Sequence, residues 1–198
     1  MSDRQMQITS DLALADRKRL PDALRVLLND FPRDAWAGHP NYSELIAFWL
    51  DRHLMFRRLI ERLSLDAMSA LDHAIGAEDY RRRLANAGGM LLRELHSHHQ
   101  IEDRHYFPVM AALDQRVQAG FELLDKDHHD IDGLLGGFAD SANAVLSANP
   151  NDKNLFQDTV AEFRRQLLAF DPLLIRHLVD EEELVVPLLL KCAPEQFR

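Results

Sequence analysis

Four long stretches of the chain repeat apolar residues every three or four positions, the spacing of one face of an α-helix. They cover about residues 43–74, 78–113, 115–147 and 155–191. Their stripes include Trp49, Phe56, Ile60, Leu84, Leu91, Leu95, Phe121, Leu124, Ile131, Leu135, Phe138, Phe163, Leu167, Phe170 and Leu174. No stretch alternates apolar and polar residues with a period of two, so the pattern predicts an all-α fold without a sheet.

Helix-breaking residues separate or interrupt these stretches. The residues 149–152 (Asn-Pro-Asn-Asp) predict a turn followed by the start of the fourth helix. Asp171 and Pro172 predict a kink or a break within that helix. Four long helices with short connections predict an up-down four-helix bundle.

A shorter extension precedes the predicted bundle. Residues 20–31 predict an amphipathic helix with Leu24, Leu27, Leu28 and Phe31 on one face, and Pro32 ends it. We therefore divide the chain into an N-terminal extension, residues 1–40, and a helical-bundle domain, residues 41–198.

Composition narrows the class of protein. The formal net charge of −9 disfavours binding to nucleic acid or to an anionic membrane surface. No apolar run approaches the roughly 20 residues that span a membrane, and the polar N-terminus does not resemble a secretory signal. The single cysteine, Cys192, excludes an internal disulfide and a thiolate metal cluster. It suits the reducing cytoplasm, which is the predicted location.

The chain has ten histidines, and several of them occupy positions within the apolar stripes, where a polar side chain is unusual. Two segments share the pattern H-x-x-x-E-x-x-x-x-x-P, and the helix before each carries a histidine in its own stripe. In chain order these residues are His53, His98, Glu102, Pro108, His128, His177, Glu181 and Pro187. The chain therefore resembles two related helical hairpins whose polar side chains can converge on one centre.

This arrangement predicts a metal centre. Residues four apart lie about 40° apart around a helix and roughly 6 Å apart along it, so a pair can hold one ion or two adjacent ions. Asp132 stands in this relation to His128. Buried carboxylates are costly without a compensating positive charge, which a metal ion supplies. The candidate ligands are His53, His98, Glu102, His128, Asp132, His177 and Glu181.

The number and type of ligands indicate two ions. Imidazole and carboxylate without thiolate suit iron, zinc, copper or manganese, whereas a lone zinc uses about four ligands. If Glu102 and Glu181 each bind both ions, they and the five other ligands make about nine metal–ligand bonds. A bridging oxygen adds two more, which gives about eleven of the roughly twelve bonds that two octahedral ions take. The open position can take a small ligand such as dioxygen. We expect two iron ions with a bridging oxo or hydroxo group, with zinc or manganese as alternatives.

The same residues carry a resemblance to a known family. The stretches WLDRH, HSHHQIEDRHYFP, DHHDIDGLL and RHLVDEEELVVP, within about residues 43–191, are similar to those of the hemerythrin-like (HHE cation-binding) domain family. The resemblance implies a four-helix bundle with a non-haem di-iron centre that binds dioxygen reversibly.

The chain departs from the oxygen-carrier form of this family at one position. That form has two histidines four apart on its third helix, whereas here Asp132 follows His128. A carboxylate there makes the site more anionic, which favours the oxidised metal and weakens simple reversible oxygenation. Asp132 can also orient a ligand without binding the metal, and His99 is the alternative ligand.

Three functions remain open at this stage. The first is a binding protein that senses, stores or delivers dioxygen or nitric oxide. The second is a di-iron enzyme acting on peroxide or nitric oxide, so whether the chain is an enzyme is left undecided. The third is a structural or iron-homeostasis role through a protein partner. The expected partners are a small diatomic ligand and either a second copy or another protein, with no nucleic acid or membrane.

Overall fold

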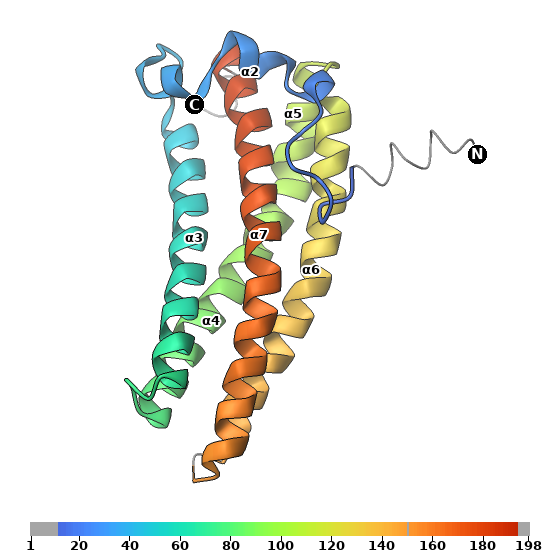
Figure 1. Cartoon of the computed structure of the whole chain (residues 1–198). Helices are drawn as coiled ribbons and strands as arrows, with labels where there is room; N and C mark the ends of the chain where they lie inside the picture. Colours follow the sequence, from blue (N-terminus) through green and yellow to red (C-terminus); the bar gives the residue numbers. More distant parts are fainter. Residues whose placement is uncertain (1–11, 150, 194–198) are drawn as a thin grey trace, which may run out of the picture. The chain divides into compact units, whose positions relative to one another are not determined.

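The computed structural model describes residues 12–149 and 151–193, which contain helices and no strand. The four long helices are α3 (Glu44–Leu71), α4 (Ala77–Ile101), α6 (Gln118–Ser147) and α7 (Lys153–Cys192) (Figure 1). They confirm the predicted all-α helical bundle.

The start of α7 follows the predicted turn chemistry. The side-chain oxygen of Asp152 accepts a hydrogen bond from the backbone N–H of Leu155 at 3.1 Å, so Asp152 caps the helix. Pro150 lies outside the described residues. Further along, α7 passes through Asp171 and Pro172 without ending, so the predicted break at this position is wrong.

The predicted second helix is interrupted. After α4 come a five-residue π-helical turn, η3 (Glu102–Tyr106), and a short helix, α5 (Phe107–Leu113). Within η3 the N–H of Phe107 donates to the carbonyl of Glu102, five residues back. Proline lacks an N–H and its ring crowds the preceding turn, so Pro108 favours a widened turn here. Such π-helical turns are frequent at functional sites.

The N-terminal extension contains less α-helix than predicted. The expected helix over residues 20–31 is divided into a 3-10 turn, η1 (Asp22–Leu24), and one α-helical turn and a half, α2 (Val26–Asp30). A second 3-10 segment, η2 (Arg33–Gly38), leads to α3. Leu20, Leu27 and Trp36 are nonetheless buried, so the extension packs through its apolar residues.

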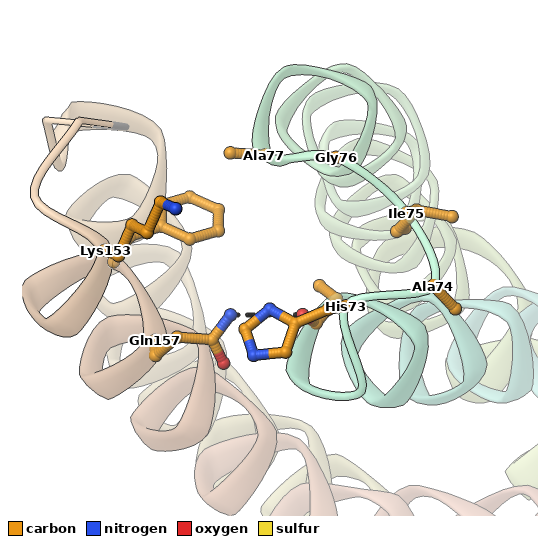
Figure 2. A pocket seen from close by; sticks show the side chains of 9 residues that line it. His73, Ala74, Ile75, Gly76, Ala77, Lys153 and Gln157 are labelled. Carbon is orange, nitrogen blue, oxygen red and sulfur yellow. Dashed lines mark hydrogen bonds between the residues drawn. The ribbon is translucent and has the colours of Figure 1, made fainter.

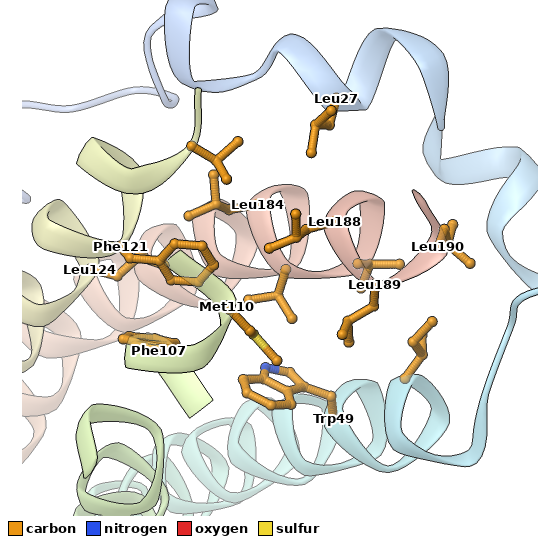
Figure 3. Close-up of a cluster of buried hydrophobic side chains, with 14 of the residues drawn as sticks. Leu27, Trp49, Phe107, Met110, Phe121, Leu124, Leu184, Leu188, Leu189 and Leu190 are labelled. Atoms are coloured by element: carbon orange, nitrogen blue, oxygen red, sulfur yellow. The ribbon is translucent and has the colours of Figure 1, made fainter. Parts of the chain in front are cut away.

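The chain divides into two compact units, and each long helix contributes to both. The first unit, which we call the histidine unit, comprises residues 1–53, 99–130 and 173–198. Its apolar core joins the extension to α3, α5, α6 and α7 (Figure 3). Members of this core include Leu27, Trp49, Phe107, Met110, Phe121, Leu124, Leu184 and Leu188.

The second unit, which we call the apolar unit, comprises residues 54–98 and 131–172. Its interior combines aliphatic and aromatic side chains: Phe138 lies 5.2 Å from Phe163 and 6.3 Å from Phe170, between ring centres. Gly88 allows α4 to approach Phe138 closely, since a Cβ at this position would lie 3.7 Å from the ring. None of the helices in the described part of the chain is both long and apolar enough to cross a membrane.

Candidate metal centre

Three histidines of the histidine unit converge from three helical segments. His99 of α4, His128 of α6 and His177 of α7 are all buried, and each offers a ring nitrogen within 4.8 Å of the others. The rings of His99 and His128 stack with centres 4.0 Å apart, and the His177 ring lies edge-on to both. This first group can supply three imidazole ligands to one ion.

A second group consists of two histidines and two glutamates. His53 of α3, Glu102 of η3 and Glu181 of α7 lie with His98, the residue before His99 in α4, and their ligand atoms are within 4.8 Å of one another. His53, Glu102 and Glu181 are buried, and His98 is half-buried. This group can supply imidazole and carboxylate ligands to a second ion.

The two glutamates connect the groups. Glu102 Oε2 lies 3.6 Å from Nε2 of His128, and Glu181 Oε2 lies 3.4 Å from Nε2 of His177, both in the first group. On the other side, Glu181 Oε1 lies 3.3 Å from Nε2 of His53. Both carboxylates are therefore placed where they could bridge two ions.

In three of the histidines a carboxylate lies close to Nδ1, the ring nitrogen on the side away from the ligand group. Nδ1 of His53 lies 3.0 Å from Glu182, and Nδ1 of His128 lies 2.6 Å from Asp103. Nδ1 of His177 lies 3.5 Å from Asp127. A carboxylate on one ring nitrogen fixes the imidazole orientation and raises its basicity as a metal ligand, with the other nitrogen directed at the ion.

Aromatic side chains surround the centre. The indole N–H of Trp49 donates a hydrogen bond to Glu181 Oε1, and the Trp49 ring packs edge-on against Tyr106 at 5.0 Å. Phe107 stacks on His128 with ring centres 5.3 Å apart. These contacts fix Glu181 and His128 and limit the access of water.

The protonation of the metal-free site reflects its burial and crowding. Burial, followed by the neighbouring Glu181, raises the pKa of Glu102 well above its ordinary value. Burial alone would lower the pKa of His177, but Asp127 and Glu181 outweigh it and raise that pKa to about 9. Burial lowers the pKa of His128. Glu102 and His177 therefore hold a proton more readily than the free side chains do, and His128 less readily.

Two buried imidazole nitrogens indicate that the site fits a metal ion. The Nε2 atoms of His128 and His177 are buried and make no hydrogen bond among the described residues, although the carboxylates of Glu102 and Glu181 lie 3.6 and 3.4 Å away. Such atoms are costly unless something outside the protein chain binds them. Five imidazoles and two carboxylates form a donor set suited to two hard or borderline cations such as iron.

Six of the seven predicted ligands lie in the two groups, and Asp132 does not. The side chain of Asp132 is 47% exposed, and its carboxylate lies 3.6 Å from Nδ1 of His96 in the apolar unit. The buried stripe of α6 continues from His128 to Ile131, so residue 132 falls outside it. His99, the alternative considered from the sequence, stands in the first group instead.

This correction changes the charge of the centre. With Asp132 outside, the protein contributes two carboxylates rather than three. The expected preference for the oxidised metal depended on a third carboxylate, which the two groups lack. The two groups together hold seven candidate ligands, because His99 stands there and Asp132 does not.

Sequence reasoning did not find the roles of Asp127 and Arg17. Asp127 is buried beside His177, and Arg17 of the extension forms ion pairs with both Asp127 and Asp180. The available signal for Asp127 was its position directly before His128, one turn after Leu123 and Leu124. Arg17 gave no such signal, because it lies far from the histidines in the sequence.

An open pocket in the apolar unit has a different character. It has a volume of about 650 Å³ and lies beside the turn between α3 and α4 (Figure 2). Gln157 donates a hydrogen bond to the carbonyl of Ala70 at its edge, and His73 and Lys153 are exposed. No acidic residue lines it, so it lacks the ligand set of the histidine unit.

Comparison with known proteins agrees with the geometry. The family described as hemerythrin HHE cation binding domain matches residues 44–189. No curated protein and no solved structure matches the chain. The family match spans α3 to α7 and contains all the residues of both groups. Because it covers well over half of the chain, this protein belongs to the hemerythrin HHE cation-binding domain family.

Proposed function

We propose that the chain is a non-haem di-iron protein that binds dioxygen or a related small ligand such as nitric oxide. The observation that carries this proposal is the pair of adjacent ligand groups joined by Glu102 and Glu181. One ion alone would not use seven donors. When bound, iron supplies a redox-active centre at which a small ligand can attach.

The side chains have distinct tasks in this proposal. The residues that would hold the ions are His53, His98, His99, His128 and His177, and the carboxylates of Glu102 and Glu181 would neutralise their charge. Trp49 holds Glu181 in place through its indole N–H. Phe107 stacks on His128, and Tyr106 packs edge-on against Trp49, so both place apolar surface beside the ligand groups.

Elemental analysis and optical spectroscopy test the proposal. Protein purified without oxygen should contain about two irons per chain, and air should produce a new charge-transfer band that disappears when oxygen is removed. A variant with His128→Ala provides the control and should give no such band. Zinc in the native protein, without a redox response, would contradict the proposal and favour a structural role.

The rival enzymatic function gives a different result. A di-iron redox enzyme would consume peroxide or nitric oxide in many turnovers per chain. Measurement of peroxide loss over time by the iron-loaded protein distinguishes the two functions. Binding without turnover supports a carrier or sensor, whereas steady turnover would replace it with the enzyme.

A further inference from the structure

Two arginines of the N-terminal extension reach the carboxylates that hold the histidine ligands. Arg17 is buried and donates to Asp127, whose carboxylate lies against Nδ1 of His177. Arg33 donates from Nη1 to Glu182 Oε2 at 2.8 Å, and Glu182 Oε1 lies 3.0 Å from Nδ1 of His53. The extension thus makes two arginine–carboxylate–histidine relays.

Each relay ends in a different ligand group. His177 belongs to the three-histidine group, and His53 belongs to the group that contains the two glutamates. Both arginines precede residue 44, where the family match begins. The arginines therefore lie outside the part of the chain that the family model covers, whereas the carboxylates and histidines lie inside it.

The extension is fastened beside Arg17 by further hydrogen bonds. Arg17 Nε donates to Asp180 at 2.7 Å, and the backbone N–H of Leu20 donates to the same carboxylate at 3.1 Å. Arg176 donates to the carbonyl of Lys18 at 2.7 Å. Such a network holds Arg17 in one position and fixes the oxygens of Asp127 beside His177.

We propose that Arg17 and Arg33 are positioning residues of the metal centre, acting through Asp127 and Glu182 on His177 and His53. This rests on the proposed metal-binding function. Fixing the carboxylate fixes the imidazole, and loss of such outer partners typically weakens metal binding about 10- to 100-fold. The extension then helps to orient two of the metal ligands, although its described residues contribute no ligand themselves.

The Asp103–His128 pair, which no arginine of the described extension contacts, offers an internal comparison. Asp103 belongs to η3, and its side chain is 28% exposed. Changes in the extension should therefore alter His53 and His177 and leave His128 unchanged. A general loss of folding would disturb all three histidines together.

The test compares arginines of the extension that differ in their partners. Arg33→Gln removes the ion pair with Glu182 at a half-exposed side chain. Arg17→Lys keeps a positive charge beside Asp127 but removes the guanidinium group. The controls are Arg25→Gln, which removes an ion pair to Glu183, and Arg19→Gln, which removes an exposed pair to Asp22. Each full-length variant is loaded with ferrous iron and then challenged with a chelator.

We expect Arg33→Gln to lose iron at least about tenfold faster than Arg25→Gln, and Arg17→Lys to lose iron faster than Arg19→Gln. Rates within about twofold of the matched controls would overturn the proposal. Proton NMR of the metal-free protein gives a second readout, the Nδ1–H signals of the histidines. Arg33→Gln should shift the signal of His53 and not that of His128.

The two readouts separate this proposal from the proposed function. If the wild-type chain takes up no iron while the His53 signal still responds to Arg33→Gln, the di-iron function fails and the relay stands. If iron binds and neither readout distinguishes Arg33→Gln from Arg25→Gln, the relay fails and the di-iron function stands.

Discussion

The two units use the same four helices to build opposite kinds of interior. Ten charged or histidine side chains are buried in the described part of the histidine unit: Arg17, His53, His99, Glu102, Asp127, His128, His177, Asp180, Glu181 and Glu182. In the apolar unit, Asp66 is the one such side chain among the described residues, and it pairs with Arg62 and Arg83. The rest of that interior is aliphatic or aromatic.

This contrast shows how one helical repeat can serve both stability and function. A stripe position taken by Phe163 or Leu167 in the apolar unit stabilises the fold through burial. A stripe position taken by His177 or Glu181 has a desolvation cost that only a cation and a hydrogen-bond network can offset. Substitutions in the two units should therefore affect different quantities.

The largest expected effect on stability lies in the apolar unit. Phe163→Ala should lower the free energy of unfolding by about 3–5 kcal/mol, because it leaves a cavity beside Phe138. The loss should be the same with and without metal, as measured by urea denaturation of both forms. A loss confined to the metal-loaded form would break the distinction between the units.

The next effect concerns metal content. His128→Ala should reduce bound iron from about two ions per chain to one or none, because it removes a donor of the first group. His129→Ala is the matched control: His129 is exposed on the same helix, and it should keep the full metal content. Equal iron content in the two purified variants would contradict the assignment of His128.

A third pair of variants tests whether His99 or Asp132 is the metal ligand. His99→Ala should lower iron content, whereas Asp132→Asn should leave it unchanged, since Asp132 is exposed beside His96. Elemental analysis of both variants decides between the two candidate ligands. Loss of iron in Asp132→Asn alone would restore the interpretation drawn from the sequence.

The smallest effect is a pH dependence. A raised pKa of Glu102, and of His177 to about 9, means that protonation stabilises the metal-free fold and that this stabilisation declines as pH rises. Metal binding displaces these protons and strengthens with pH. The difference in melting temperature between loaded and metal-free protein should therefore widen from about pH 6 to about pH 8. A gap that narrows would be inconsistent with proton displacement.

The sequence predicted the helices and six of the residues that lie in the two ligand groups, because both follow the same periodicity. His53, His128 and His177 replace apolar residues at stripe positions, so burial could be inferred for each. At α4 the stripe through Leu95 continues equally well to residue 98 or 99, and only the structure shows that both approach the ligand groups.

Two features of the structure could not be predicted from the helical periodicity of the sequence. The π-helical turn at Glu102–Tyr106 depends on a local adjustment before Pro108, yet Pro187 occupies the equivalent place in the repeat and leaves α7 intact. The contact of Arg17 with Asp127 joins residues 110 positions apart. Contacts of this kind depend on the path of the extension, which has no regular pattern to predict it.

Anomalous diffraction from crystals of the iron-loaded protein tests the central claim most directly. The account predicts two iron peaks inside the histidine unit, one among His99, His128 and His177, and one beside His53 with Glu102 and Glu181. An absence of peaks there, or iron held only at the exposed pair His96 and Asp132, would contradict it.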